Sequence, residues 1–474
     1  MMKIVMKFGG SSLASTGRIR QAARIVQRFS TKNKIVIVAS AMDDVTDRLV
    51  KIVESIQKGE MRGAQTDLSR LQRFHTTVAR SIAREGSGKD LVASTGSLNT
   101  ELGKTVEGAS HLREVTLRSR DYLLSFGERF SAPILASALR ALGLKALPMT
   151  GGEAGITTDD NFGEAKPLIE VSYHQLRKRL EPFLSRNQIP VVTGFIASSV
   201  DGNPTTLGRG GSDYTASMIG AALAADEIWI WTDVDGLMTA DPRIVKNTKV
   251  LPSVSFGEAL ELSFFGAKMM HPHALQPASQ RKVPVRIKNS WKPDGTGTLV
   301  SEKESDDNGR VVKAVSIIRN VGIVTVGGAG MVGAPGVAAK VFQTLGANRV
   351  NVIMISQGSS EATISTVVAR GEVDRAVRAL QLAMLGQGQV DKIVQEKDAC
   401  IIAVVGSGMK GTPGVAARVF SAVASKKVNV RMVAQGSSEY NVSFVVSEKE
   451  GPEAVRAIHD EFRLGLIGPD SFRQ

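Results

Sequence analysis

Residues 206–215, which read TLGRGGSDYT, combine the groups that a site for a negatively charged ligand needs. Three glycines just before a predicted helix let the backbone curl, and they leave free N–H groups at the positive end of that helix. Arg209 adds a fixed cation and Asp213 adds a carboxylate, neither of which a simple turn requires. The segment therefore predicts an anion site, and a helix that is merely capped by Ser212 or Asp213 remains the alternative.

A second glycine turn follows the first predicted strand, residues 3–8. Gly9 and Gly10 allow a ligand to approach the backbone closely. Lys7 precedes the glycines, so the segment does not match the Walker A pattern. A lysine beside a glycine turn is usually just solvated, but Lys7 lies in an apolar strand, where a buried ammonium needs an anionic partner.

Polar side chains also follow two other predicted strands. Ser40 and Thr46 come after residues 34–39, and the polar segment 232–243 comes after residues 227–231. Open α/β sheets bind ligands beyond the carboxyl ends of their strands, so these side chains are candidates for one site. Helix capping is the competing interpretation of Ser40 and Thr46.

Two more charged residues stand in unusual surroundings. Glu128 lies among the large apolar residues of 123–130, so it is either on an exposed helix face or held inward by cations. Lys268 occupies a turn of small residues, 266–272. It is a second lysine associated with such a turn, after Lys7 near the N-terminus.

The elements that would carry these residues alternate between strands and helices. Nearly continuous apolar runs indicate strands in a parallel sheet that is buried on both faces. We expect residues 1–300 to form a catalytic domain with a helical insertion at about 47–143, and residues 301–310 to form a linker. The predicted strands are 3–8, 34–39, 144–149, 189–196, 227–231 and 283–289.

The rest of the chain is a duplication. Pro335-Gly336-Val337 recurs as Pro413-Gly414-Val415, and other matches keep the same spacing of 78 residues. Each copy, 311–394 and 395–474, predicts a small α+β module. A glycine–proline turn that opens a helix can hold a carboxylate, so the modules are candidates for binding an amino acid. The alternative is that their sheet edges serve only to join two chains.

The composition is that of a globular protein, with 42% hydrophobic and 22% charged residues among 474. No apolar run reaches the roughly 18 residues of a membrane span, and residues 1–8 are too short for a signal peptide. One cysteine permits no intrachain disulfide, which favours a cytoplasmic location. The net charge is +13, but basic residues are dispersed and only 5% are aromatic. Neither nucleic acid nor a membrane is therefore an expected partner.

Together these motifs resemble the aspartate kinase family, which belongs to the amino-acid kinase superfamily and carries two C-terminal ACT modules. The matching segments extend across the chain in family order: 7–12, 40–46, 126–128, 207–215, 232–243 and 266–272, then the repeat. The resemblance implies an α/β fold with a mainly parallel sheet sandwiched by helices, followed by two α+β ferredoxin-like ACT modules. It also implies a monofunctional enzyme, because 474 residues leave no room for the homoserine dehydrogenase of bifunctional relatives.

By this resemblance the chain would transfer the γ-phosphate of ATP to the side-chain carboxylate of L-aspartate, with Mg²⁺ carried by the nucleotide. Lys7 and Asp213 would be catalytic. The expected aspartate-binding residues are Ser40, Thr46, Glu128 and Arg209. Met238 stands where some relatives carry an aromatic residue near the adenine, which leaves base selectivity open. The expected phosphate- and nucleotide-binding residues are Gly9, Gly10, Gly210, Gly211, Thr232, Asp233, Met238, Arg243 and Lys268.

The resemblance further implies feedback inhibition by an amino acid bound to the first module. Segment 350–361 resembles threonine-sensitive modules more than lysine-sensitive ones, and lysine is the alternative effector. A homodimer or homotetramer would form through the modules. Two other functions stay open: another amino-acid or nucleoside-monophosphate kinase on the same fold, and a non-catalytic amino-acid sensor. The expected effector-binding residues are Met331, Pro335, Gly336, Val337, Asn351, Gln357 and Ser360.

Overall fold

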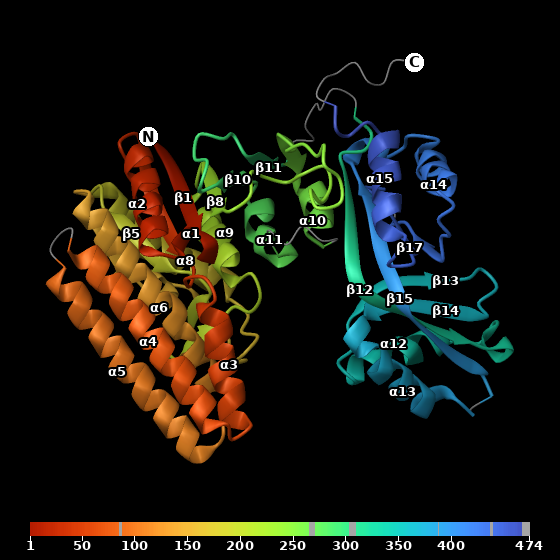
Figure 1. The fold of residues 1–474 in the computed structure, drawn as a ribbon, viewed down its shortest axis with the longest axis horizontal. Helices are drawn as coiled ribbons and strands as arrows, with labels where there is room; N and C mark the ends of the chain where they lie inside the picture. The colour runs from red at the N-terminus through yellow and green to blue at the C-terminus, as the bar shows by residue number, and fades with distance from the viewer. Residues whose placement is uncertain (85–87, 265–270, 303–309, 387, 437–438, 467–474) are drawn as a thin grey trace. The chain divides into compact units, whose positions relative to one another are not determined.

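Strands of mostly apolar residues form the central sheet of the first of two compact units into which the chain divides (Figure 1). The structure is a computed structural model that describes all residues except 85–87, 265–270, 303–309, 387, 437–438 and 467–474. In the described part the sheet has the order β3-β5-β2-β1-β8-β10-β11-β9, and only β10 and β11 pair antiparallel. The expected, mainly parallel sheet is thus confirmed. The strands are β1 Met2–Phe8, β2 Asn33–Ala39, β3 Ala146–Met149, β5 Ile189–Thr193, β8 Glu227–Thr232, β9 Ser253–Ser255, β10 Val285–Asn289 and β11 Thr298–Ser301.

Helices cover this sheet, and four long ones pack side by side beyond it (Figure 1). The four are α3 Val45–Gln57, α4 Met61–Ala83, α5 Lys89–Leu112 and α6 Leu117–Ala141. The remaining helices of this unit are α1 Gly10–Leu13, α2 Thr16–Ser30, α7 Gly151–Ala154, α8 Ile169–Ser185, α9 Gly211–Leu223 and α11 Pro272–Gln280.

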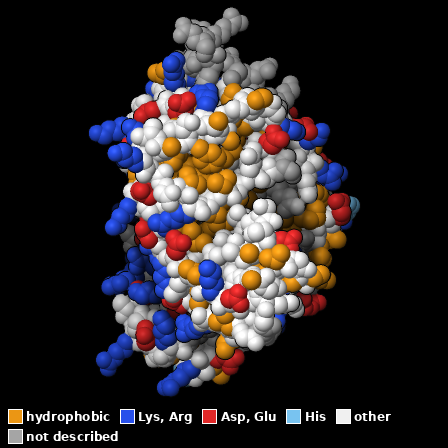
Figure 2. All heavy atoms as spheres, turned by 90° about the vertical axis from the view of Figure 1, so that its right-hand side faces the viewer, with side chains coloured by type: hydrophobic (Ala, Val, Ile, Leu, Met, Phe, Trp, Pro, Cys, Tyr) orange, Lys and Arg blue, Asp and Glu red, His pale blue; other side chains and the backbone are white. Residues whose placement is uncertain are grey.

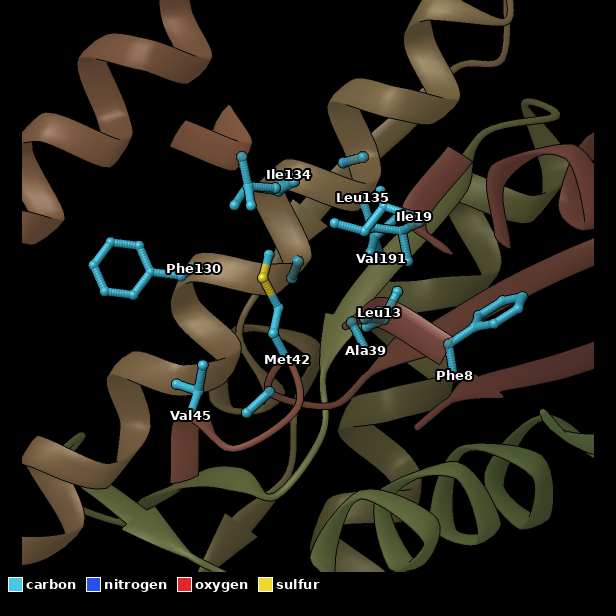
Figure 3. Packing of buried hydrophobic residues seen from close by; sticks show 14 of the residues in the cluster. Phe8, Leu13, Ile19, Ala39, Met42, Val45, Phe130, Ile134, Leu135 and Val191 are labelled. Atoms are coloured by element: carbon cyan, nitrogen blue, oxygen red, sulfur yellow. The ribbon is translucent and has the colours of Figure 1, made fainter. Parts of the chain in front are cut away.

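Helix α6 is the long helix that also enters the core of the sheet. Figure 3 shows its residues Phe130, Ile134 and Leu135 packed with apolar side chains of β1, β2, β5 and α1–α3. Met42 and Val45 belong to the same cluster. They flank the polar residues 43 and 44 of the loop after β2, so the core holds this part of the loop on both sides. The core thereby holds α6 and that loop in fixed positions relative to β1.

The predicted strand 189–196 is wrong in one respect, because it is two strands in different sheets. β5 ends at Thr193, and β6 Ile196–Ser199 pairs with β4 Thr157–Thr158 and β7 Pro204–Thr206 in a small sheet of its own. Phe195 has φ +63°, a left-handed conformation that bulky residues rarely adopt and that turns the chain out of the first sheet. The apolar run 189–196 does not reveal this break because both halves are buried.

The second unit contains an antiparallel sheet, in the described residues, of order β13-β14-β12-β15-β17-β16. Its strands are β12 Ala314–Gly327, β13 Val352–Gln357, β14 Thr363–Ala369, β15 Lys392–Val405, β16 Met432–Ala434 and β17 Asn441–Val446. Its helices are α12 Val337–Ala347, α13 Val373–Met384, α14 Val415–Ser425 and α15 Gly451–Glu461. Met238–Leu251 and most of α10 Phe256–Phe264 group with this unit, although the expected catalytic domain reached residue 300.

The two modules of the second unit share their longest strands. The first part of β12, 314–318, pairs with 401–405 of β15, and Val315 packs in the core of the second module. After a register shift, 321–327 pairs with both β14 and the first part of β15, and Val324 packs in the core of the first module. The beginning of β12 therefore completes the sheet of the second module.

Helices of the length and apolar character needed to cross a lipid bilayer are absent from the described residues. Figure 2 shows one face of the molecule, on which apolar side chains gather in the centre and Lys and Arg side chains lie mostly toward the margin.

Candidate active site

A cleft of about 780 Å³ in the first unit collects all six predicted catalytic and aspartate-binding residues. It lies at the carboxyl ends of β1 and β2, at the start of α9 and along one face of α6, which is where α/β sheets bind ligands. Among the predicted residues, those that line it are Lys7, Gly10, Ser40, Thr46, Glu128, Arg209, Gly210, Gly211 and Asp213.

Lys7 and Asp213 form a nearly buried ion pair in this cleft. Lys7 Nζ lies 2.6 Å from Asp213 Oδ1, and the two side chains are only 11% and 9% exposed. β1 lies between β2 and β8 in the sheet, and Lys7 as a whole is 9% exposed, so its ammonium is largely shielded from solvent. Asp213 stands in the first turn of α9, where the helix dipole favours a carboxylate. The ammonium therefore has the anionic partner that the sequence demanded, and it points into the cleft.

The start of α9 requires glycine for two separate reasons. Gly208 and Gly210 have φ values of +69° and +74°, which glycine adopts without strain. A Cβ on Gly210 would lie 2.5 Å from the Cβ of His271, and one on Gly211 would lie 2.8 Å from the ring of Phe195. Arg209 is exposed on this loop, and no carboxylate of the described residues pairs with it. Backbone N–H groups and one uncommitted guanidinium thus face the same cleft.

Glu128 is held inward by a close approach of α6 to the loop after β2. A Cβ on its neighbour Gly127 would lie 2.8 Å from the Cβ of Ala41, so only glycine permits this approach. Glu128 Oε1 accepts a hydrogen bond of 3.1 Å from the Ala41 N–H, and the buried Oε2 has no partner. Burial raises the pKa of Glu128 to about 8, against the opposing effects of the Ala41 N–H and the Lys7 charge. A cation that binds beside Glu128 would therefore favour the ionised form of this carboxyl group.

Arg120 and Leu124, which also line the cleft, and Asp121, which contacts it through other residues, were not predicted from the sequence. Arg120 and Leu124 share one face of α6 with Glu128, at a spacing of four residues that places side chains in a row. Asp121 does not line the cleft, but it binds Thr206 and Gly163, which do. Arg120, Leu124 and Glu128 follow one another at intervals of four residues, and this spacing could have predicted that Arg120 shares a helix face with Glu128. No local pattern distinguished Asp121 from other acidic residues.

Most of the predicted nucleotide-binding residues that the structure describes are not among those that line the cleft. Thr232 ends β8 and Asp233 follows it. Thr232 Oγ1 donates a 3.1 Å hydrogen bond to Asp233 Oδ1, and neither residue lines the cleft. The Gly9 N–H donates to Trp231 O at 3.1 Å, which joins the first glycine turn to the end of β8.

The other predicted nucleotide-binding residues lie outside the first unit or outside the described residues. Met238 and Arg243 group with the second unit, where Arg243 forms a bidentate pair with Asp241. Lys268 lies outside the described residues. Nucleotide contacts by all five residues stay predictions.

A smaller cavity, of about 360 Å³, lies in the first module at the turn that precedes α12. Glu361, which was not predicted, also lines it, and its Oε2 accepts a 2.9 Å hydrogen bond from the Gly333 N–H. Asn351 and Ser360 are not among its lining residues; Asn351 precedes β13, at the opposite end from Gln357, about 20 Å away along an extended strand. The predicted effector residues that line the cavity are Met331, Pro335, Gly336, Val337 and Gln357.

Comparison with known proteins agrees with this arrangement. Residues 2–289 match the model of the amino acid kinase family, and residues 324–384 and 402–462 match an ACT domain. Aspartokinase 1, chloroplastic, of Arabidopsis thaliana is 34% identical over 472 residues, which cover 97% of this chain and 80% of the relative. The chain belongs to the aspartokinase family. Aspartokinase 2, chloroplastic, of the same plant is 35% identical, with 84% of it covered.

Other aspartokinase relatives are longer. The bifunctional aspartokinase/homoserine dehydrogenase 2, chloroplastic, of Zea mays is 34% identical, and the chain spans about half of its length, 52%. Among solved structures, E. coli aspartokinase III in complex with aspartate and ADP superposes with a TM-score of 0.82 at 27% identity, over 97% of this chain and 99% of that one. The same enzyme in complex with lysine and aspartate gives a TM-score of 0.80 at 28% identity, with 97% and 99% covered. Both aspartokinase III structures support the fold described above.

Proposed function

We propose that this protein is an ATP-dependent aspartate kinase, which phosphorylates the side-chain carboxylate of L-aspartate to give 4-phospho-L-aspartate. The observation that carries the proposal is the convergence of Lys7, Arg209, Glu128 and the α9 glycine amides in one cleft. These groups complement two anionic substrates and one ammonium. The family relationship and the aspartate and ADP bound to E. coli aspartokinase III support the same choice.

Charge neutralisation and positioning account for most of the proposed catalysis. A free aspartate side chain has a pKa of about 3.9, so at neutral pH the nucleophile is already ionised and needs no strong general base. Lys7 would neutralise the phosphoryl group in transfer, and the amides of Gly10 and Gly210 would bind its oxygens. The predicted amides of Gly9 and Gly211 are already used, because they donate to Trp231 O and Gly208 O, both at 3.1 Å. Asp213 would hold the Lys7 ammonium in the cleft, as the 2.6 Å contact indicates.

The substrate amino acid would be bound at both ends. The planar guanidinium of Arg209 matches the α-carboxylate, to which it can donate two parallel hydrogen bonds. The unpartnered Oε2 of Glu128 would accept from the α-ammonium, and the proton of Glu128 would leave as the cation enters. Ser40 and Thr46 would bind the side chain of aspartate from the wall formed by the loop after β2.

The proposed nucleotide contacts are Thr232 at the end of β8 and residues that follow β8 and α10 in the sequence. Thr232, Asp233, Met238, Arg243 and Lys268 are the proposed contacts, on the strength of the sequence motifs alone. Mg²⁺ would enter with the phosphates of ATP and would neutralise charge on them.

Threonine is the proposed feedback inhibitor, and lysine is the alternative. Glu361 is the only carboxylate that lines the cavity of the first module in the described residues, and one carboxylate suits the single ammonium of threonine. Lysine would bring a second ammonium, but E. coli aspartokinase III has been solved with lysine, which keeps that effector open. As an aspartate kinase, the protein would open the biosynthesis of lysine, threonine, methionine and isoleucine.

Assembly through the modules and a cytoplasmic location complete the proposal. β13 and β16 are the edge strands of the second sheet, and each exposes an apolar side chain, Ile355 at 47% and Val433 at 41%. β13 and β16 also lie near each other in this chain, and edge strands with exposed apolar side chains favour pairing with a second chain, as a homodimer or homotetramer.

An ADP-release assay with aspartate, with glutamate as the matched control, tests the proposed function. We expect ADP release with aspartate, and lower activity when threonine is added. Release with glutamate alone would assign a different amino-acid kinase. No release with either, together with binding of threonine or lysine, would instead favour a non-catalytic sensor.

A further inference from the structure

Asp121 is a fully buried carboxylate that the proposed chemistry does not use. It stands on α6 and is 0% exposed. Its Oδ1 accepts a 2.8 Å hydrogen bond from Thr206 Oγ, while its Oδ2 accepts from the N–H groups of Thr206 at 3.1 Å and Gly163 at 2.9 Å. No cation pairs with it in the part of the chain that the structure describes. Burying a carboxylate without a cation costs free energy, which these three hydrogen bonds offset. The same three bonds fix the position of the Asp121 side chain.

Both partners of Asp121 line the cleft, and they come from different segments. Thr206 ends β7 and stands three residues before Arg209. Gly163 has φ +89° and belongs to the loop 159–166, whose base is closed by Asp159 through hydrogen bonds to the N–H groups of residues 161 and 166. A single side chain of α6 therefore fixes two separate walls of the cleft.

The same helix provides the opposite wall. Arg120, Leu124 and Glu128 line the cleft from α6, whereas Arg209 reaches it from the segment between β7 and α9. In the proposed function Glu128 takes the ammonium of the substrate and Arg209 takes its α-carboxylate. Asp121 links α6, through Thr206, to the segment that carries Arg209. Arg118, also on α6, adds an exposed hydrogen bond of 2.6 Å to Asn203, directly before β7.

We infer that Asp121 is a positioning residue that sets the width of the cleft and thereby selects the length of the acidic amino acid that is phosphorylated. The inference rests on the proposed function and deepens it. Aspartate and glutamate differ by one methylene, and a pocket of fixed width discriminates such a pair by about 10- to 200-fold in kcat/KM. Loss of the link would widen the range of spacings that Arg209 and Glu128 can adopt.

Asp121→Asn is the central test, because the amide keeps the volume but replaces one acceptor by a donor. An amide nitrogen at the Oδ2 position would break the bonds to both backbone N–H groups, whereas one at the Oδ1 position would require Thr206 Oγ1 to become the acceptor. In either orientation the negative charge that strengthens these hydrogen bonds is lost. We expect KM for aspartate to rise about tenfold, KM for ATP to change less than about twofold, and the preference for aspartate over glutamate to fall about fivefold or more.

Asp67→Asn is the matched control. Asp67 is a carboxylate of the same unit, 3% exposed, that pairs with Lys51 at 3.1 Å and does not line the cleft. We expect it to lower the thermal midpoint and to leave the amino-acid preference unchanged. If Asp121→Asn does not fold, Thr206→Val removes only the Oγ bond, and Thr206→Ser retains it. The valine variant should then relax the preference and the serine variant should not.

The failure of this inference is distinguishable from failure of the proposed function. A wild-type protein that does not phosphorylate aspartate refutes the function, and the preference is then measured between its true substrate and the next longer homologue. A wild type that does phosphorylate aspartate, with a preference unchanged in Asp121→Asn and Thr206→Val, overturns the positioning role. So does a parallel rise of KM for aspartate and for ATP, which indicates general distortion.

Discussion

Lys313 and Asp391 occupy equivalent positions in the two modules but carry opposite charges. Each lies beside a glycine that the repeat places 78 residues apart, Gly406 and Gly328. In the first module the Asp391 carboxylate accepts directly from the Ala329 N–H at 3.0 Å. In the second, the equivalent Ser407 N–H donates to Glu258 Oε1 at 2.7 Å, and Lys313 Nζ lies 2.9 Å from Glu258 Oε2. The turn needs a carboxylate in both modules, and α10 supplies it in the second.

This relationship predicts how the second module responds to substitution. Glu258→Ala leaves a buried ammonium, because the Lys313 and Glu258 side chains are 2% and 0% exposed. Removing one partner of a buried ion pair costs about 3–5 kcal/mol. Adding Lys313→Asp to Glu258→Ala copies the first module and should restore part of that stability. Urea unfolding, with hydrogen exchange of residues 401–415, measures the loss of stability in Glu258→Ala and its recovery in the double variant. A double variant no more stable than Glu258→Ala would contradict the equivalence of Lys313 and Asp391.

The raised pKa of Glu128 predicts coupled proton release. At pH 7 the empty cleft holds a mostly protonated carboxyl, since burial raises its pKa from 4.5 to about 8. Binding of aspartate should release a proton, and KM for aspartate should fall as pH rises from about 6.5 toward 8.5. Calorimetry in buffers of different ionisation enthalpy counts the protons. Glu128→Gln should abolish both effects, and persistence of either in this variant would assign them to another group.

The same shift has a consequence for stability. The folded protein binds the Glu128 proton more tightly than the unfolded chain does, so this group makes folding less favourable as pH rises between 4.5 and about 8. Glu128→Gln, which cannot ionise, should therefore be more stable than the wild type at pH 8, and the difference should disappear near pH 4. Thermal unfolding at the two pH values checks this sign.

Gly210 and Gly208 form a matched pair for testing the α9 loop. Both have left-handed φ, but a Cβ on Gly210 would lie 2.5 Å from His271 Cβ, whereas one on Gly208 meets no atom within 4 Å. Gly208→Ala should cost about 1 kcal/mol of strain and little activity. Gly210→Ala must also displace α11 or the loop, so kcat/KM for ATP should fall by about tenfold more. Equal effects of the two substitutions would show that the His271 contact is unimportant.

Lys7 is expected to act on the transition state more than on binding. Lys7→Met removes the charge and keeps most of the volume, so kcat should fall about 10²- to 10³-fold with a small change in KM for aspartate. Lys3 lies in the same strand but bonds Leu223 O, and Lys3→Met serves as the control with near-normal kcat. A tenfold rise in KM with unchanged kcat in Lys7→Met would make this residue a binding group only.

Features determined by local chemistry could be predicted from the sequence, and features determined by distant pairing could not. An ammonium in an apolar strand requires an anion, so a partner for Lys7 was expected even before Asp213 was seen beside it. The repeat likewise predicted two modules, because its spacing is visible in the sequence. Asp121 resembled any acid near a helix start, since its partners Thr206 and Gly163 lie 85 and 42 residues away.

The division of β12 between two modules was similarly invisible. The exposed pair Arg319-Asn320, with Asn320 at φ +58°, lies at the register shift, but nothing local shows that the two halves of β12 pair with different parts of β15. The left-handed Phe195 after the end of β5 is a third such feature, because the neighbouring Gly194 allows a turn but does not show that the phenylalanine adopts the left-handed conformation. In each case a contact between distant segments overrides the local pattern.

The shared strands constrain how this regulatory region can be transplanted. A cut at residue 394 would divide β15, and a fragment that begins after β12 would lack the strand that completes the second module. Protein engineers who wish to graft the effector response onto another enzyme would have to move residues 311–466 as one piece and also supply a carboxylate in place of Glu258, which pairs with the buried Lys313. For the same reason, recombination within this region would yield misfolded chimeras, so evolution is expected to have exchanged it only whole.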